Sequence, residues 1–182
     1  MLGASAVAVL LLSGCGSSQV RNAGPQGTAL AADYRGAPAA LRVLYLERNR
    51  LLGGGVGAFE RELRALRGRP VVINAWASWC DNCTEEFSIF QTVAPRFGRR
   101  VAFLGVDVAD SGGAAWLAKH PLSFPSYSDH SWSIDRTISP AAANYAPVTY
   151  FISRAGKLVY PHLGPYLSAS TLARDIRLYL HA

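Results

Sequence analysis

The strongest constraint on the fold is an apolar run that leads directly into a pair of cysteines. The run RPVVINAW ends at Trp76, and the two cysteines follow at Cys80 and Cys83. A continuous apolar run of this length is typical of a strand buried on both faces of a sheet. The segment after Cys80 has helical character, so its sulfur should lie at a helix N-terminus. The unpaired N–H groups and the helix dipole at such an end favour the thiolate form of cysteine.

The rest of the chain alternates between strand-like and helix-like segments. A turn signal at 154–156 lies between two strand-like runs, which predicts an antiparallel hairpin. Pro95 should bend or end the helix that carries it, and the glycine-rich residues 51–59 should form a flexible connection. The predicted strands are 41–47, 69–76, 99–108, 147–153 and 157–163, with one more near Tyr127, and the predicted helices are 57–66, 81–97, 111–120 and 168–182. This order predicts an α/β fold with a mixed sheet, parallel in the middle, antiparallel at one end and flanked by helices.

The spacing of the cysteine pair suits three kinds of function. A structural zinc site needs four ligands, and the four histidines (120, 130, 162 and 181) show no ligand spacing. A purely structural disulfide would close a loop so short that it constrains the unfolded chain little. Redox chemistry fits best, because Cys80 can attack a disulfide and Cys83, one turn later, can resolve the mixed disulfide. We therefore expect no metal and no bound cofactor at this site.

Three stretches resemble the thioredoxin superfamily: VVINAWASWCDNC, the later YAPVTYFISRAGKLV and the final helix. More narrowly, they are similar to its membrane-tethered TlpA-like thiol–disulfide oxidoreductases, which include reductases of cytochrome c maturation. The resemblance runs from about Gly57 to Ala182. It implies a thioredoxin-like fold, and the long separation of Cys80 from Pro147 implies the strand–helix insertion of that branch.

The resemblance also implies roles for individual residues. Cys80 would be the exposed attacking thiolate and Cys83 the shielded resolving thiol. Pro147 would be the cis-proline that lies against the active-site disulfide, with the backbone of Ala146 offered to an extended substrate. Trp79 would flank the surface on which the substrate lies.

Two departures from thioredoxin itself bear on the chemistry. Thioredoxin has a buried aspartate on the strand before the motif, whereas this chain has Asn74, which cannot accept a proton. Glu86 lies three residues after Cys83 on the same helical face, and we expect it to be the acid–base partner of Cys83. The second departure is the dipeptide between the cysteines, which is Asp81-Asn82 where many relatives have proline before the second cysteine. Asp81, Glu85 and Glu86 place negative charge around the site, and like charge disfavours the thiolate. A poorly stabilised thiolate makes the disulfide harder to reduce, so the pair should act as a reductase.

The front of the chain resembles a bacterial lipoprotein signal. A short apolar run, not preceded by Lys or Arg, ends in Leu-Ser-Gly-Cys, which resembles a lipobox with Cys15 as the lipidated residue. We expect residues 1–14 to be a signal peptide, 15–40 a lipid-anchored flexible tether and 41–182 the thioredoxin-like domain. The protein would then lie on the extracytoplasmic side of the cell membrane, in the periplasm or at the cell exterior.

The net charge of +6 comes mainly from arginines, which are scattered along the sequence apart from Arg99-Arg100 and the helical set Arg61, Arg64 and Arg67. This distribution favours solvated faces tolerant of an anionic membrane over a nucleic-acid site. The expected partners are extracytoplasmic protein thiols and disulfides and a membrane-embedded electron-transfer protein, and the chain itself should be a monomer. Three alternatives stay open: a thiol oxidase on the same scaffold, a copper-handling or redox-sensing lipoprotein, and a thiol peroxidase. The last would need a Thr-x-x-Cys setting, which neither Cys80 nor Cys83 has.

Overall fold

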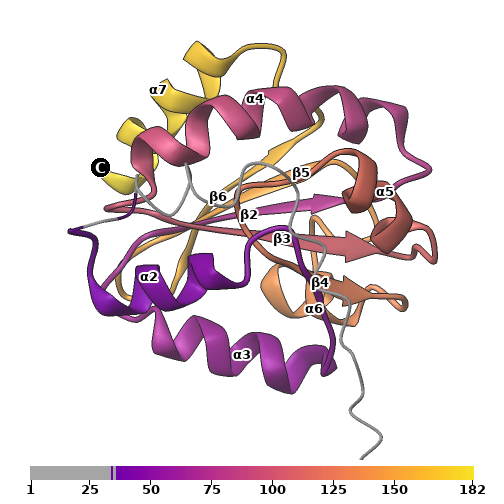
Figure 1. Ribbon diagram of the computed structural model, residues 1–182, viewed down its shortest axis with the longest axis horizontal. Coiled ribbons are helices and arrows are strands. Elements are labelled where there is room, and N and C mark those ends of the chain that lie inside the picture. The colour runs from indigo at the N-terminus through magenta and orange to yellow at the C-terminus, as the bar shows by residue number, and fades with distance from the viewer. Residues whose placement is uncertain (1–33, 35) are drawn as a thin grey trace, which may run out of the picture.

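The structure is a computed structural model that describes residues 34 and 36–182. At its centre lies one six-stranded sheet in the order β1-β4-β3-β2-β5-β6 (Figure 1). The strands are β1 (Leu51–Leu52), β2 (Val71–Trp76), β3 (Ala102–Val108), β4 (Ser126–Asp129), β5 (Val148–Ile152) and β6 (Leu158–Leu163). Strands β1, β4, β3 and β2 are parallel, and β5 and β6 are antiparallel to their neighbours. The predicted mixed sheet is confirmed.

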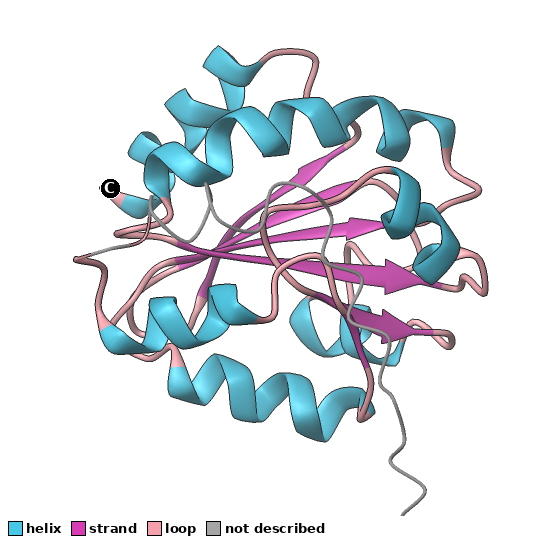
Figure 2. Cartoon of the chain, viewed as in Figure 1, coloured by secondary structure: helices cyan, strands magenta, loops and turns pink. Residues whose placement is uncertain are grey.

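Helices cover both faces of this sheet. They are α2 (Ala39–Leu46), α3 (Gly55–Ala65), α4 (Asp81–Phe97), α5 (Gly113–Lys119), α6 (Ser133–Ile138) and α7 (Ala169–Leu180). Figure 2 shows α4 and α7 on one side of the sheet and α3 and α6 on the other. The segment between α4 and β5 holds two strand–helix units, β3–α5 and β4–α6, in agreement with the predicted insertion. No helix in residues 34 and 36–182 is long and apolar enough to cross a membrane.

Strand β2 lies in the middle of the core and fixes the position of the cysteines. Every residue of β2, β3 and β5 is buried, as expected for continuous apolar runs covered by helices. Val71 pairs with Ala102 of β3 on one side and with Ile152 of β5 on the other. Because both neighbours are in register with β2, its C-terminal end is held rigidly where the cysteine motif begins.

The prediction of a strand at 41–47 is wrong, because these residues belong to α2. The buried side chains are Leu41, Leu44 and Tyr45, whereas Val43 and Leu46 are exposed. This spacing of i, i+3 and i+4 is the helical period, which a run of seven mostly apolar residues conceals. The connection predicted at 51–59 also differs, since it contains β1 and the start of α3.

The packed part of the chain begins before the expected boundary at 41. Tyr34 is buried and stacks on Tyr45, with ring centroids 4.0 Å apart, and Ala37 is buried as well. The last residues assigned to the tether are thus part of the domain. Residues 16–33 of the predicted tether, the predicted signal peptide and Cys15 lie outside the described residues.

Candidate active site

The two cysteines lie where β2 passes into α4. Cys80 is the N-cap of α4, and its sulfur accepts a hydrogen bond from the Cys83 N–H at 3.2 Å. A disulfide joins the two residues, whose Cα atoms are 5.3 Å apart. Cys80 is 7% exposed, and Cys83 is 0% exposed. Cys80 thus keeps a small exposed surface and Cys83 has none, as expected if Cys80 is the attacking cysteine and Cys83 the resolving one.

The loop before Cys80 is tied to the connection between β3 and α5. The Trp79 indole N–H donates to the Ala109 carbonyl at 3.1 Å, and its side chain is 56% exposed. Asp110 accepts from the Ser78 N–H at 2.6 Å and from the Ser78 hydroxyl at 2.9 Å. It also accepts from the Gly112 N–H at 2.7 Å. One carboxylate thus holds the backbone that positions both Trp79 and the cysteine motif.

Two aspartates with opposite pKa shifts lie beneath this loop. Burial raises the pKa of Asp110, but the hydrogen bonds from Ser78 and Gly112 outweigh it, and the net pKa is lowered. Burial, reinforced by the neighbouring Asp110, raises the pKa of Asp107 to about 8. The interaction between the two carboxyl groups contributes to both shifts, raising the pKa of Asp107 and lowering that of Asp110. Of the two carboxyl groups, Asp110 is therefore the more readily ionised.

The peptide bond between Ala146 and Pro147 is cis, as predicted. Pro147 directly precedes β5, in which Val148 pairs with Ala75 of β2. The proline consequently lies at the same end of the sheet as the cysteine motif. The Pro147 carbonyl accepts a hydrogen bond from the Gly164 N–H at 3.0 Å. Tyr145, two residues before Pro147, is 53% exposed.

Glu86 lies in the second turn of α4 and is fully buried. Its carboxyl oxygens accept from the Asn74 side-chain amide at 2.7 Å and from the Tyr166 N–H at 3.0 Å. Burial raises the pKa of Glu86 to about 7, although both hydrogen bonds oppose the shift. A carboxyl with this pKa can gain or lose a proton at physiological pH.

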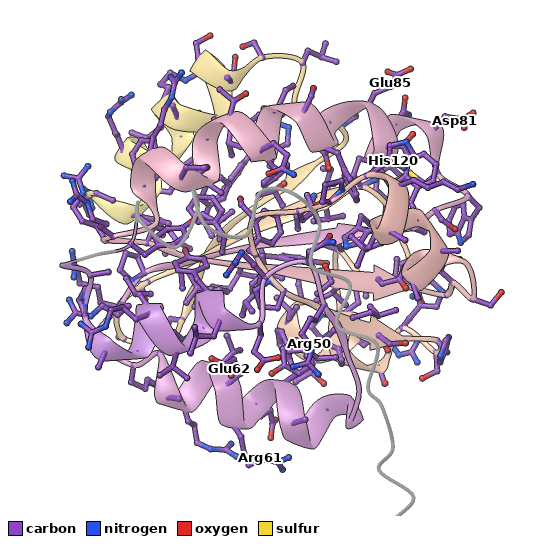
Figure 3. All side chains as sticks on the ribbon, in the orientation of Figure 1. Arg50, Arg61, Glu62, Asp81, Glu85 and His120 are labelled. Carbon is purple, nitrogen blue, oxygen red and sulfur yellow. A yellow bond between two sulfur atoms is a disulfide. The ribbon has the colours of Figure 1, made fainter. Side chains whose placement is uncertain are left out.

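The other two acidic residues of the first turns, Asp81 and Glu85, are exposed. Figure 3 labels both at the end of the molecule where α4 begins. Since Glu86 is only partly ionised at neutral pH, the negative charge near the disulfide comes mainly from these two residues. In the described chain, no group of three His, Cys, Asp or Glu residues is arranged to hold a metal.

Sequence reasoning missed Asp110 and Tyr166. Asp110 offers a weak signal, since it is a polar residue that follows a buried strand at the edge where the cysteines lie. Tyr166 offers none, because it acts on Glu86 through its backbone N–H, a group that every residue except proline has.

The fold and the cysteine pair define a thioredoxin-like protein with a Cys-x-x-Cys disulfide at the start of a helix. The chain belongs to the AhpC/TSA family, whose model matches residues 57–161.

Several relatives share this domain. The thiol-disulfide oxidoreductase ResA of Bacillus thuringiensis (strain Al Hakam) is 26% identical over 106 residues, which cover 57% of this chain and 60% of ResA. The thiol:disulfide interchange protein DsbE of Pseudomonas fluorescens biotype C is 28% identical over 102 residues, 54% of each chain. The structure of the pneumococcal exposed lipoprotein thioredoxin Etrx1 from Streptococcus pneumoniae strain TIGR4 is 21% identical with a TM-score of 0.55, covering 64% of this chain and 89% of Etrx1. The match thus spans less than two thirds of the two curated relatives.

Proposed function

We propose that this protein is an extracytoplasmic thiol–disulfide oxidoreductase that reduces protein disulfides. The observation that carries the proposal is the Cys80–Cys83 disulfide at the N-terminus of α4, with one sulfur reachable and the other shielded. The names of ResA and DsbE describe the same chemistry. By analogy with the TlpA-like branch, a client in cytochrome c maturation is the favoured substrate.

The proposed reaction moves two electrons from the dithiol to a client. The Cys80 thiolate attacks a client sulfur, so that a mixed disulfide forms and the first client thiolate leaves. Cys83 then loses its proton and attacks the Cys80 sulfur, which releases the second client thiolate and closes the Cys80–Cys83 disulfide. Two protons end on the client thiols, and a membrane-embedded dithiol partner must return two electrons to the pair.

Glu86 is proposed as the group that takes the proton from Cys83. It follows Cys83 by three residues on the same face of α4, is buried with it, and has a pKa raised to about 7. Asn74 does not supply this function, because its amide donates to Glu86 rather than accepting a proton. A base matched to neutral pH is suited to deprotonating a shielded thiol.

The surface around Cys80 is proposed to bind the client chain. Trp79 is exposed beside it, and the cis bond between Ala146 and Pro147 presents the backbone at the end of β5. An extended client segment can lie between these two features, with its disulfide above Cys80. Its recognition would then depend on backbone contacts, which suits varied clients.

The proposed location is the outer face of the cell membrane, with a monomer anchored by lipid at Cys15. The lipobox-like sequence supports this, and so does Etrx1, which is described as an exposed lipoprotein and has the same fold.

The activity is tested by exchange with a disulfide-bonded protein, using purified protein and its cysteine variants. Cys80→Ser should abolish exchange, because the attacking sulfur is lost. Cys83→Ser should instead accumulate mixed disulfides at Cys80, since the resolving step is missing. Full activity in both variants would contradict the proposal.

A further inference from the structure

Basic side chains that are far apart in the sequence meet at the end of the sheet opposite the disulfide. Val71, Ala102 and Ile152 are paired across β3, β2 and β5 at this end. Two positions away from each of these residues along the chain, just outside the sheet, lie Arg69, Arg100 and Arg154 respectively. The basic end consists of Arg67, Arg69, Arg99, Arg100, Arg154 and Lys157. Figure 3 shows nitrogen atoms gathered there, far from the labelled Asp81.

Arg67 and Arg154 each donate a hydrogen bond to the loop that carries the other. Arg67 donates to the Ala155 carbonyl in the β5–β6 turn, and Arg154 donates to the Gly68 carbonyl in the α3–β2 loop at 3.3 Å. A Cβ on Gly156, whose φ is +73°, would lie 2.8 Å from the Arg67 guanidinium, so a larger residue there would displace this side chain. Both guanidinium groups are therefore fixed close together by neutral carbonyl groups.

This arrangement leaves the positive charge largely unneutralised. A cavity of about 190 Å³ lies between α3 and the β5–β6 turn, lined in part by Arg64, Arg67, Arg69 and Arg154. Among these, Arg64 pairs with Glu60 at 3.6 Å. Arginines held by carbonyls keep free N–H groups that match the oxygens of a phosphate.

The chain also enters the domain at this end. Tyr34, the first described residue, packs on Gly98, next to Arg99 and Arg100: a Cβ on Gly98 would lie 2.3 Å from its ring. The upstream 33 residues, with Cys15, therefore join the domain beside the basic end. A tether that enters here would be attached at the basic end of the domain.

We propose that the basic end docks the domain on the anionic phospholipid headgroups of its membrane. Lipid phosphates occupy the cavity beside Arg67 and Arg154, and Arg99 and Arg100 contact neighbouring headgroups. Since β2 separates the two ends by roughly 20 Å, the Cys80–Cys83 pair faces away from the lipid. This inference goes beyond the proposed redox activity and does not depend on it.

The test is cosedimentation of the full chain with lipid vesicles. The chain carries Cys15→Ala, so that no acyl group contributes. It should bind vesicles in which about one third of the phosphatidylcholine is replaced by phosphatidylglycerol, and it should detach as salt is raised from about 0.1 to 0.5 M. The double variant Arg99→Gln/Arg100→Gln should lower the partition coefficient about 30-fold, or about fivefold per charge. Both side chains are exposed, so the fold should be unaffected.

The variant Arg67→Gln/Arg154→Gln should lower binding by a similar factor. A matched control, Arg61→Gln/Lys119→Gln, removes two exposed charges from other surfaces and should change binding by no more than about threefold. Equal losses in control and test variants would overturn the proposal, because net charge alone would then explain binding. Failure of the parent to prefer anionic vesicles would overturn it as well. So would equally tight binding of polyglutamate at the same charge concentration, which would indicate an acidic polypeptide partner.

Orientation provides a separate measurement. If the basic end contacts lipid, a soluble dithiol should reduce the Cys80–Cys83 disulfide at the same rate with and without anionic vesicles. A rate that falls several-fold on vesicles would place the disulfide against the lipid and contradict the proposed orientation.

Discussion

Glu86 gives the protein a stability that depends on pH. Its pKa is about 7 in the folded chain and 4.5 for the ordinary group. Between these values the folded protein holds a proton that the unfolded chain has lost, so the free energy of unfolding falls as pH rises. A shift of this size corresponds to about 3 kcal/mol.

Replacement of Glu86 by Gln should remove most of this dependence. Measured by urea unfolding at pH 4 and pH 8, the loss of stability on raising the pH should be about 3 kcal/mol smaller in Glu86→Gln than in the parent. Glu85→Gln, a change at an exposed position of the same helix, should keep the parental slope. The same slope in Glu86→Gln as in the parent would show that Glu86 is already ionised when folded.

Asp110 changes the free energy of unfolding in the opposite direction, because its pKa is lowered. Its contribution to stability is present at neutral pH and is lost as pH falls. Asp110→Asn should cost about 2 kcal/mol at neutral pH, since the charged acceptor for Ser78 and Gly112 is lost. The difference should shrink as pH falls below the ordinary carboxyl range, where the parent also loses this charge. Iodide should quench Trp79 fluorescence more strongly in the variant, because the loop is less restrained. Ser78→Ala, which removes only one hydrogen bond, should have a smaller effect on both measurements.

The charge of the first turn of α4 should affect the reduction potential of the Cys80–Cys83 pair. Asp81 is exposed and follows Cys80 directly. Asp81→Lys adds a cation at the helix N-terminus, which stabilises the Cys80 thiolate and therefore the reduced form. The thiol pKa should fall, and the reduction potential should rise by about 30 mV, or about 1.4 kcal/mol. Equilibration with glutathione measures this change, and a parental potential near −120 mV would indicate an oxidase rather than a reductase.

Helix α2 can be distinguished from the strand expected there by a pair of substitutions. Leu44 is 3% exposed, and Leu46 is 71% exposed. Leu44→Ala should cost about 2–4 kcal/mol in unfolding free energy, whereas Leu46→Ala should change it by less than about 0.5 kcal/mol. In a strand, residues 44 and 46 would lie on the same face, so similar costs would contradict the helix.

The strands that the sequence predicts most directly are those that are buried along their whole length. Strands β2, β3 and β5 are buried at every position, so their apolar runs identify them directly. The short helices α2 and α6 were missed for a physical reason. In α2 an almost continuous apolar run conceals the helical period, whereas α6 has only two apolar residues, Ile134 and Ile138, which are too few to define a period.

At the scale of the whole molecule, the sequence indicated the active site but not the basic end. The cysteines are close together in the chain, so their chemistry can be read locally. The arginines at 67, 99 and 154 meet only because two parallel strands start, and one antiparallel strand ends, at the same edge. Their grouping depends on strand order, which the spacing of the arginines along the sequence does not reveal.

Two separable contacts should hold the whole molecule at the membrane: the lipid at Cys15 and the basic end. In cells, Cys15→Ala should leave exchange activity intact and release most of the protein from membranes, or block its processing. A residual membrane-bound fraction should wash off in high salt, because only the basic end would hold it. Unchanged, salt-resistant fractionation, with no acyl mass on the native peptide, would count against lipidation.

The contact between Tyr34 and Gly98 restricts how this protein can change through evolution. The tyrosine ring occupies the space that any larger residue at 98 would need. A substitution at 98 would therefore survive only in lineages whose residue 34 had already become smaller. Across homologues, these two positions should vary together, and their joint loss would mark the lineages in which the start of the domain has been rebuilt.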